Sequence, residues 1–302
     1  MKKLKTPVPE KHIMKYLIAV NTYNRSLILV QRCLESCLNQ KIQPVKIIIV
    51  DQNEVPLIFP PDINNNPLVE IINIHKKSIS DARNSITIPS EAEWVFFCDD
   101  DGFPAENYSE ILSNILIKNP QLDLLGGVYL REDNKEYYNP RQKIKGGIKS
   151  FIDTKKIMGS NLVVRSKVFD ELGRFSPDFG VGAYWGAGEE TDLVWRAFFN
   201  RNKIDFFHEL VIYHPPMLSR SLGGEMDKSF KYGVGKAGLV SKWLFKKGKL
   251  LVIYELTEMF FIPLVHIIIG IFSLNLKKIL SNFAAIGGRI FGLIKGIFYR
   301  FA

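Results

Sequence analysis

Cysteine is scarce in this sequence, and the usual phosphate-binding glycines are missing from it. The 302 residues hold three cysteines, Cys33, Cys37 and Cys98, in odd number and without a Cys-x-x-Cys spacing. This pattern excludes a disulfide scaffold and favours buried thiols in a reducing compartment. Neither Gly-x-Gly-x-x-Gly nor Gly-x-x-x-x-Gly-Lys follows the first apolar segment. Ordinary dinucleotide-binding and P-loop folds therefore lose their main support.

Positive charge is concentrated near the C-terminus. Of the net charge of +9, all comes from residues 226–302, which hold twelve Lys and Arg against three acidic residues, whereas residues 1–225 hold 28 of each. This asymmetry predicts that the tail, and not the body, meets a polyanion. At the other end, residues 1–15 are polar with two prolines and no apolar core, so we expect no signal peptide there.

Apolar segments alternate with helical patterns along residues 1–225. The expected strands are residues 16–21, 45–50, 68–74, 94–98, 122–130, 159–165 and 205–213, and the expected helices are 27–40 (with Ser26 as N-cap), 78–88, 108–119, 166–172 and 193–202. The alternation predicts an α/β fold with a doubly wound, mostly parallel sheet. Such sheets bind ligands beyond the carboxyl ends of their strands, where residues 22–25, Asp51 and residues 99–101 fall.

The segment 94–104 is the centre of this pattern. Five strand-forming residues run directly into Asp99, Asp100 and Asp101, and Gly102 and Pro104 close the turn. Three carboxylates at the tip of a buried strand call for a cation, and Mg²⁺ or Mn²⁺ prefers such oxygens. The alternative is a solvated acidic turn.

A second acidic cluster, Glu189, Glu190 and Asp192, follows the glycine-rich segment 180–188. Acids are common at a helix N-terminus, but one of these could equally serve as a general base. In the preceding segment, Tyr184, Trp185 and Gly186 combine flat apolar faces with mobility, which suits an acceptor sugar ring; a loop that only packs is the alternative.

Two further segments bear on this site. His214 ends a strand, where it is either a metal or phosphate contact or a structural histidine. The charged loop 131–149, which contains glycine and proline, is expected to border an acceptor cleft.

Five motifs in order, at residues 20–25, 49–51, 82–84, 99–101 and 188–192, resemble family 2 of the inverting glycosyltransferases. The resemblance spans residues 15–216. It implies a GT-A fold and an enzyme of the bacterial polysaccharide-biosynthesis type. It implies that Thr22, Tyr23, Asn24 and Arg25 line the pocket of a UDP- or dTDP-type sugar donor, with Asp51 on the base and Arg83 at the ribose and diphosphate. It also implies Asp99 on the ribose or metal, Asp100 adjacent, and Asp101 on Mn²⁺ or Mg²⁺. His214 is a further metal candidate from its place at the strand end. The family usually has Glu-Asp where this chain has Glu189-Glu190, with the second acid as base, which makes Glu190 the candidate and leaves Glu189 and Asp192 as the others.

The pattern of basic and apolar residues over 226–302 predicts a helical membrane-associating region. Residues 242–249 are basic and aromatic, residues 259–276 are mostly apolar, and residues 276–302 form a basic amphipathic pattern, which suits an anionic membrane surface. Glycines recur every fourth residue at 288, 292 and 296 and would permit close helix contact, including a homo-oligomer. The alternative is that these segments pack against the body.

Together these features predict an enzyme at the cytoplasmic face of the membrane, peripheral or anchored by its C-terminus, that uses a glycan or lipid-linked acceptor in cell-surface polysaccharide synthesis. No nucleic-acid module is recognisable. Two other functions remain open. A sugar nucleotidyltransferase usually has a glycine- and arginine-rich loop after its first strand, which is missing here. A non-catalytic glycan-binding or scaffold protein is the other.

Overall fold

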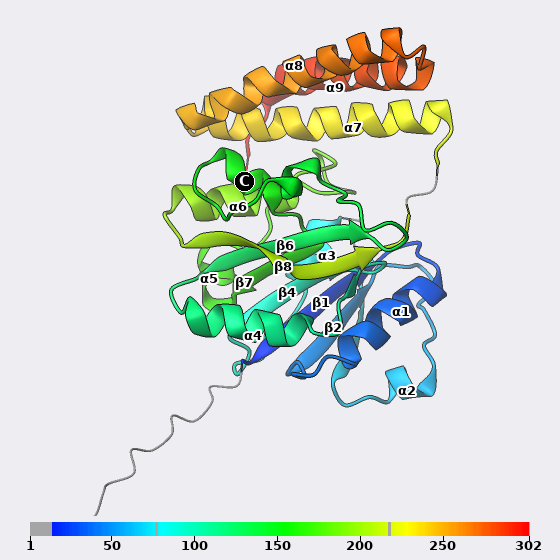
Figure 1. Cartoon of the computed structure of the whole chain (residues 1–302), viewed down its shortest axis with the longest axis vertical. Helices are drawn as coiled ribbons and strands as arrows, with labels where there is room; N and C mark the ends of the chain where they lie inside the picture. Colours follow the sequence, from blue (N-terminus) through cyan, green and yellow to red (C-terminus); the bar gives the residue numbers. More distant parts are fainter. Residues whose placement is uncertain (1–13, 76–77, 217–218, 302) are drawn as a thin grey trace, which may run out of the picture.

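A computed structural model describes residues 14–75, 78–216 and 219–301, so most of the polar N-terminal stretch lies outside the described residues. Its body is an eight-stranded sheet of order β3-β2-β1-β4-β7-β6-β8-β5 (Figure 1). The strands are β1 (Tyr16–Thr22), β2 (Lys46–Asp51), β3 (Val69–Asn73), β4 (Trp94–Asp99), β5 (Phe103–Pro104), β6 (Leu124–Arg131), β7 (Asn161–Arg165) and β8 (Ile204–His214).

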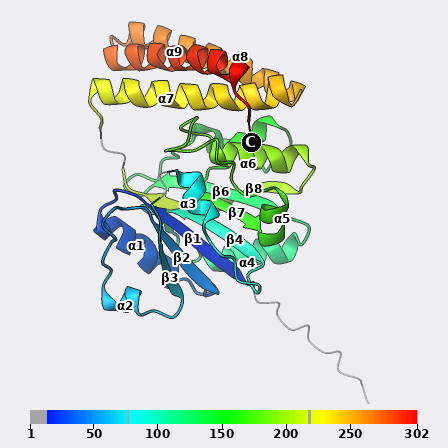
Figure 2. The ribbon, with the colours of Figure 1, turned by 180° about the vertical axis from the view of Figure 1, so that it is seen from behind.

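Helices cover both faces of the sheet and form a separate layer beyond one end of it (Figures 1 and 2). The helices are α1 (Leu27–Leu38), α2 (Pro61–Asn64), α3 (Ile79–Asn84), α4 (Tyr108–Lys118), α5 (Ser166–Glu171), α6 (Glu189–Phe199), α7 (Leu222–Val240), α8 (Ile253–Phe272) and α9 (Leu276–Phe298). Four shorter helical turns are η1 (Pro140–Lys143), η2 (Ile152–Lys156), η3 (Ser241–Lys246) and η4 (Leu250–Val252).

The first four strands form a parallel half-sheet. β1 lies between β2 and β4, and β3 pairs with β2, all in parallel register. Because their side chains are apolar on both faces, helices cover both faces: α1 and α4 pack on one, and α3, α5 and α6 on the other. The expected α/β class and the doubly wound arrangement are confirmed, since parallel strands buried on both faces require this layering.

The remaining strands depart from parallel order. β7 runs antiparallel to both β4 and β6, and the short β5 is antiparallel to β8. β6 and β8 are parallel, with a bulge between Gly127 and Val128. A Cβ on Gly127 would lie 2.1 Å from the carbonyl oxygen of Leu210, so only glycine fits this close strand approach.

Three long helices form the layer beyond the body. α7 lies nearest to α6, and α8 and α9 run side by side on the outer side of α7 (Figures 1 and 2). The predicted boundary between residues 225 and 226 falls in the first turn of α7. α9 coincides with the predicted amphipathic helix, whereas the apolar helix α8 begins six residues before the expected 259.

The glycine repeat of α9 faces α7. An added Cβ would lie 2.1 Å from the carbonyl oxygen of Phe230 at Gly288, 2.6 Å from the Cβ of Ala237 at Gly292 and 2.1 Å from the Oγ of Ser241 at Gly296. The repeat therefore serves close packing inside the chain. A homo-oligomer through these helices would have to use their other faces.

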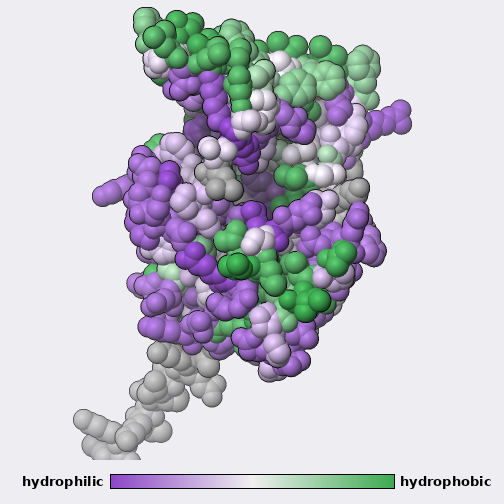
Figure 3. Space-filling model, turned by 90° about the vertical axis from the view of Figure 1, so that its right-hand side faces the viewer, coloured by the Kyte–Doolittle hydropathy of each residue, from purple (hydrophilic) through white to green (hydrophobic). Residues whose placement is uncertain are grey.

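The outer face of α8 and α9 is apolar and exposed, and Figure 3 shows it as a hydrophobic cap over a largely hydrophilic body. Its exposed side chains include Phe261, Ile268 and Phe272 on α8 and Phe291, Ile294 and Phe298 on α9. By length and composition alone, the stretch Leu250–Phe272 would suffice to cross a membrane, with a third of its most apolar window buried.

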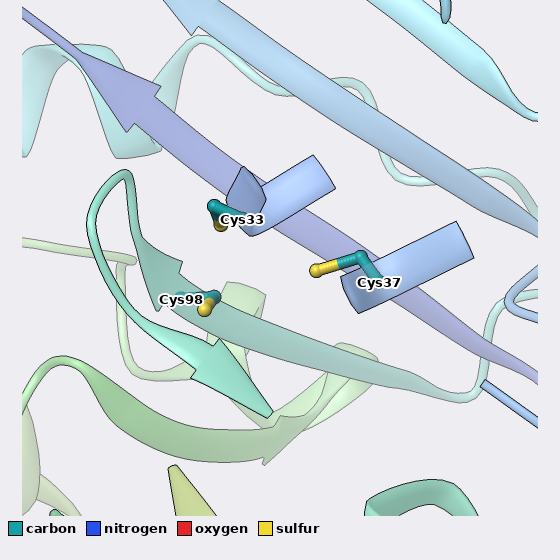
Figure 4. Close-up of side chains that lie close together, drawn as sticks. All are labelled: Cys33, Cys37 and Cys98. Carbon is teal, nitrogen blue, oxygen red and sulfur yellow. The ribbon is translucent and has the colours of Figure 1, made fainter. Parts of the chain in front are cut away.

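The three cysteines lie together between α1 and β4 (Figure 4). Cys33, Cys37 and Cys98 are fully buried, free and within 4.8 Å of one another at their sulfur atoms. The thiols of Cys33 and Cys98 contact the carbonyl oxygen of Asp99 at 3.4 and 3.6 Å. They pack beneath the acidic turn and form no disulfide.

Candidate active site

The carboxyl ends of the central parallel strands bring the predicted polar residues together. Thr22 of β1 lies opposite Asp51 of β2, and Asn21 of β1 lies opposite Asp99 of β4. The parallel register puts these strand ends at one edge of the sheet. The expected edge therefore exists, and it carries the acidic turn.

Arg83 connects three elements at this edge. It lies on α3, is only 3% exposed, and donates hydrogen bonds to Asp99 Oδ1 at 3.1 Å, to Glu189 Oε1 at 3.2 Å and to Asn21 Oδ1 at 3.3 Å. A buried guanidinium with several acceptors holds these groups in fixed geometry. It therefore links the acidic turn after β4 to the acids at the start of α6.

Arg25 and His214 hold the other two aspartates. Arg25 reaches Asp100 Oδ1 at 3.0 Å and Asp101 Oδ2 at 2.9 Å. His214, at the end of β8, places Nε2 3.0 Å from Asp101 Oδ1. The predicted residues Arg25, Asp100, Asp101 and His214 therefore lie together.

Burial makes the ionised form of the acidic turn costly in spite of its three basic partners, Arg25, Arg83 and His214. Burial raises the pKa of Asp100 to about 6 against the opposing effect of Arg25. Burial also raises the pKa of Asp99, and Asp101 and Glu189 add to the effect. Burial lowers the pKa of His214, but its hydrogen bond to Asp101 outweighs this and leaves that pKa raised. Crowded carboxylates resist ionisation unless a cation joins them.

A cavity of about 450 Å³ opens at this edge. Its lining includes Asn21 and the residues Tyr23, Arg25, Arg83, Asp99 and Asp100 that were predicted for the donor pocket. Thr22 and Asp51 lie buried beneath it. Asp51 accepts hydrogen bonds from the Asn53 side chain and the Leu57 amide and so fixes the loop that follows β2. Asn24 is exposed, in left-handed conformation, with its amide bonded to Asn53.

The acids of α6 divide between different tasks. Gly188 adopts a φ of 94° and starts the helix at Glu189. Glu189 is buried against Arg83, whereas Glu190 has no ion-pair partner within the described ranges. Burial, followed by repulsion from Glu189, raises the pKa of Glu190 to about 8. Such a group is mostly protonated at neutral pH, and its carboxylate form, which increases as the pH rises towards 8, is a stronger base than that of an ordinary glutamate.

Asp192 does not line the cavity at the strand ends. It is fully buried and bonds Arg196 at 2.9 Å, the indole nitrogen of Trp243 at 2.9 Å and Lys242 Nζ at 3.0 Å. These contacts join α6 to η3. The geometry assigns Asp192 to holding the helical layer on the body.

The predicted acceptor aromatics pack against the C-terminal residues. Trp185 is 1% exposed and stacks on Phe301, and an added Cβ on Gly238 of α7 would touch its ring. Tyr184 is half exposed, but its ring stacks on Tyr299 at 4.4 Å. Gly186 lies in the turn between them and the active-site acids, with φ of 69°. The structure therefore buries Trp185 among the C-terminal residues and does not bring it to the cavity at the strand ends.

A second cavity, of about 630 Å³, lies between the body and the helical layer. Figure 3 shows a hollow between the apolar cap and the body. Glu190, Met158 and Tyr232 line both cavities, so the two adjoin at Glu190. Tyr138, Asn139 and Arg141 of the charged loop 131–149 also line the second cavity, where an acceptor cleft was expected.

The residues at the acidic turn offer the ligand types that a hard divalent cation takes. Asp99 and Asp101 offer carboxylate oxygens and His214 an imidazole nitrogen, which suit Mg²⁺ or Mn²⁺. In the part of the chain that the structure describes, only the three cysteines bring three candidate ligand atoms within 4.8 Å of one another. Arg25 and His214 instead bind Asp101. The side chain of Arg25 is 39% exposed, so it has room to swing away.

Several lining residues were not predicted. Tyr232 and Lys236 lie on α7, and Arg289 lies on α9. α7 holds five glycines among its 19 residues, and it shows too little apolar periodicity to be predicted as a helix. Lys236 and Arg289 were counted only as part of the basic tail, because nothing local shows that the tail folds back over the site.

The comparisons with known proteins agree with this architecture. S. aureus TarS has a similar fold, with a TM-score of 0.53 at 14% identity over 75% of this chain and 40% of the TarS chain. The likeness shows a fold of the GT-A class. The model of glycosyl transferase family 2 matches residues 17–182, more than half of the chain. The chain belongs to this family of glycosyltransferases, which confirms the resemblance read from its motifs. No curated protein matches it.

Proposed function

We propose that this protein moves a sugar from a nucleotide diphosphate to a hydroxyl group of an acceptor, with inversion at the anomeric carbon. The donor lies in the cavity at the carboxyl ends of β1 and β4, and the acceptor enters the cavity beneath the helical layer. The observation that carries this proposal is the position of Glu190, which lines both cavities. A base at this junction can reach a hydroxyl group that approaches from the second cavity.

Donor binding uses the first cavity. Tyr23 and Arg83 line it, and Asp51 fixes the loop beside it. We assign the nucleotide, of UDP or dTDP type, to this end. Asp99, Asp101 and His214 would hold Mn²⁺ or Mg²⁺, which when bound would neutralise the charge that develops on the leaving diphosphate.

The transfer is a single displacement. Glu190 removes the proton of the acceptor hydroxyl while the new bond forms at the anomeric carbon and the bond to the diphosphate breaks on the opposite face. Arg83 pairs with Glu189 at 3.2 Å, so Glu190 is the acid that remains available to accept the proton. The proton ends on Glu190 and the electron pair on the diphosphate.

We further assign the reaction to a membrane surface, and the helical layer supports this assignment. α8 contacts the body through Glu255, which pairs with Lys155 and with Lys236 of α7, so one side of α8 is held on the protein. Its other side and that of α9 are apolar and exposed. This suits a pair of helices that lie in the interface of an anionic bilayer. We assign the protein to the cytoplasmic face, in polysaccharide synthesis on a glycan or lipid-linked acceptor.

The test is a panel of nucleotide-diphosphate sugars incubated with the full chain, with and without Mn²⁺. We expect one donor to raise the melting temperature and to release free nucleotide by slow hydrolysis. Release of pyrophosphate from a nucleoside triphosphate and a sugar phosphate would instead identify a nucleotidyltransferase. Binding of glycans without nucleotide release from any donor would favour the scaffold function.

A further inference from the structure

The second cavity holds a concentration of basic side chains from four parts of the chain. Arg141 comes from η1, Lys155 from η2, Lys236 from α7 and Arg289 from α9, and all four line the cavity. They are distant in sequence and meet only because the helical layer folds over the body. We call these four residues the basic cluster.

The acids beside the basic cluster do not balance it. Glu255 pairs with Lys155 and with Lys236, the latter at 3.2 Å, and Glu258 pairs with Arg141 and Lys155. Lys228 and Glu225 also line the cavity and carry opposite charges. Four basic side chains therefore share two carboxylates in a largely buried space, and Glu190 is the remaining acid of the lining.

Burial and mutual repulsion lower the pKa values of the two lysines of the basic cluster. Burial, with Lys236 and Arg141, lowers the pKa of Lys155 to about 6, and burial, with Arg289 and Arg141, lowers that of Lys236 to about 7. The Nε of Arg289 is buried without a hydrogen-bond partner among the described residues. Buried cations that repel one another are costly unless an anion joins them.

We propose that the basic cluster binds a phosphate or diphosphate group of the acceptor, close to the hydroxyl group that receives the sugar. The negative charge of such a group would favour the protonated forms of Lys155 and Lys236 and would give the four basic side chains acceptors beyond the two carboxylates that they share. The same cavity reaches Glu190, so an anion on the cluster would place the neighbouring sugar at the base. The inference deepens the proposed function and rests on it.

The position of the cavity indicates how such a group would arrive. Its roof is formed by α7 and α9, and the outer side of α9 is the apolar cap (Figure 3). A diphosphate that carries a lipid chain can leave its chain at the cap while its charged group lies on the basic cluster. A soluble glycan with phosphate groups would use the same charges without the cap.

Inorganic pyrophosphate tests the site without knowledge of the acceptor sugar. Its binding to the full chain is measured by calorimetry in the presence of EDTA, which removes metal-assisted binding at the acidic turn. We expect Lys236→Gln to weaken binding at least tenfold. Lys231→Gln is the matched control, because Lys231 lies on the same helix, exposed and paired only with Asp227 among the described residues, and it should leave binding within twofold.

Lys236→Gln also removes a buried ion pair, so a second variant protects the test against misfolding. Lys228→Gln removes a cavity cation that makes no ion pair within the described ranges, and we expect about threefold weaker binding. Equal affinities of wild type, Lys236→Gln and Lys228→Gln, or no binding by a folded wild type, would overturn the inference. Release of nucleotide from a donor by that same protein would show that the proposed function survives.

Geranyl diphosphate distinguishes the two sources of the phosphate. At least tenfold tighter binding than that of pyrophosphate would support a lipid-linked acceptor, because the chain adds apolar contact. Equal binding would support a soluble phosphate-bearing glycan. In both cases we expect Lys236→Gln to weaken binding, and this weakening supports the basic cluster as the anion site.

Discussion

Two buried clusters of opposite charge lie on either side of Glu190. At the acidic turn, four acids (Asp99, Asp100, Asp101 and Glu189) face three bases (Arg25, Arg83 and His214), so acids outnumber bases by one. Beneath the helical layer, the basic cluster faces Glu255 and Glu258, so bases are in surplus. A diphosphate is repelled by the first cluster unless a cation joins it, whereas it can bind the second directly. The comparison predicts a metal requirement on the donor side alone.

The largest effect should come from Asp101→Ala. The variant removes the carboxylate that His214 and Arg25 share, and we expect transfer to become undetectable because the donor diphosphate loses its metal. EDTA should have the same effect on the wild type and none on pyrophosphate binding at the basic cluster. The measurement is sugar transfer with added Mn²⁺.

Asp170→Ala serves as the control for that loss. Asp170 lies on α5, is exposed and pairs with Arg174, so its removal should not change transfer. Full Mn²⁺-dependent transfer by Asp101→Ala would show that the acidic turn has another role, and the contrast between the two clusters would no longer hold.

Glu190→Gln should reduce transfer by about 10²–10⁴-fold, the usual contribution of a general base. Because burial raises the pKa of Glu190 to about 8, the carboxylate form increases as the pH rises. The wild-type rate should therefore rise with pH up to about 8 and then level off. Donor binding, measured by thermal shift, should remain. A wild-type rate in Glu190→Gln would transfer the role of base to another acid.

Stability gives a second measurement for Glu190 that does not depend on activity. The folded protein holds the Glu190 proton more tightly than the unfolded chain does, so this group stabilises the fold at low pH. That contribution is lost as the pH rises through about 8. Glutamine cannot lose a proton, so the melting temperature of Glu190→Gln should exceed that of wild type by more at pH 8 than at pH 5. The same difference at both pH values would contradict the raised pKa.

Asp192→Asn should act through stability. Its carboxylate lies between Lys242, Trp243 and Arg196 with no exposure, and the variant leaves the buried Lys242 and the partly buried Arg196 without this partner. Breaking such a pair costs about 3–5 kcal/mol, so we expect a lower melting temperature. The control is Asp227→Asn, whose ion pair on α7 is exposed. A loss of transfer as large as in Glu190→Gln, without a loss of stability, would restore Asp192 as a base candidate.

Local patterns were sufficient to predict the first half of the molecule. The apolar runs that became β1, β2 and β4 each end in a polar residue, and parallel order brings these ends together, so Asp51 and Asp99 were expected at one edge. Arg83, which lies on α3, was expected there only from the family resemblance. Ser78 was the start of a predicted helix, and its hydroxyl accepts a hydrogen bond from the Asp81 amide. Each of these features depends on neighbours within a few residues.

The second half depends on contacts between distant segments. Nothing near Trp185 indicates that Phe301 and Gly238 bury it, so its flat ring was taken as a sugar contact. Asp192 belongs to the same acidic motif as Glu190, and only the fold shows that Lys242 and Trp243 bind its carboxylate. Similarly, the basic tail showed its charge in the sequence, but not that Lys236 and Arg289 turn inward while the apolar residues turn outward.

A substitution on the outward side of the helical layer should have the smallest effect, because many exposed apolar side chains contribute together to membrane binding there. Ile294→Asp puts a charge on the exposed face of α9, and we expect a several-fold decrease in binding to anionic vesicles, measured by sedimentation. Ile28→Asp is the matched control, since Ile28 is even more exposed, at 78%, but lies on α1. Equal losses in both variants would mean that net charge, and not the apolar cap, governs vesicle binding. If only Ile294→Asp is affected, the cap meets the bilayer, and the basic cluster beneath it lies within reach of a lipid diphosphate.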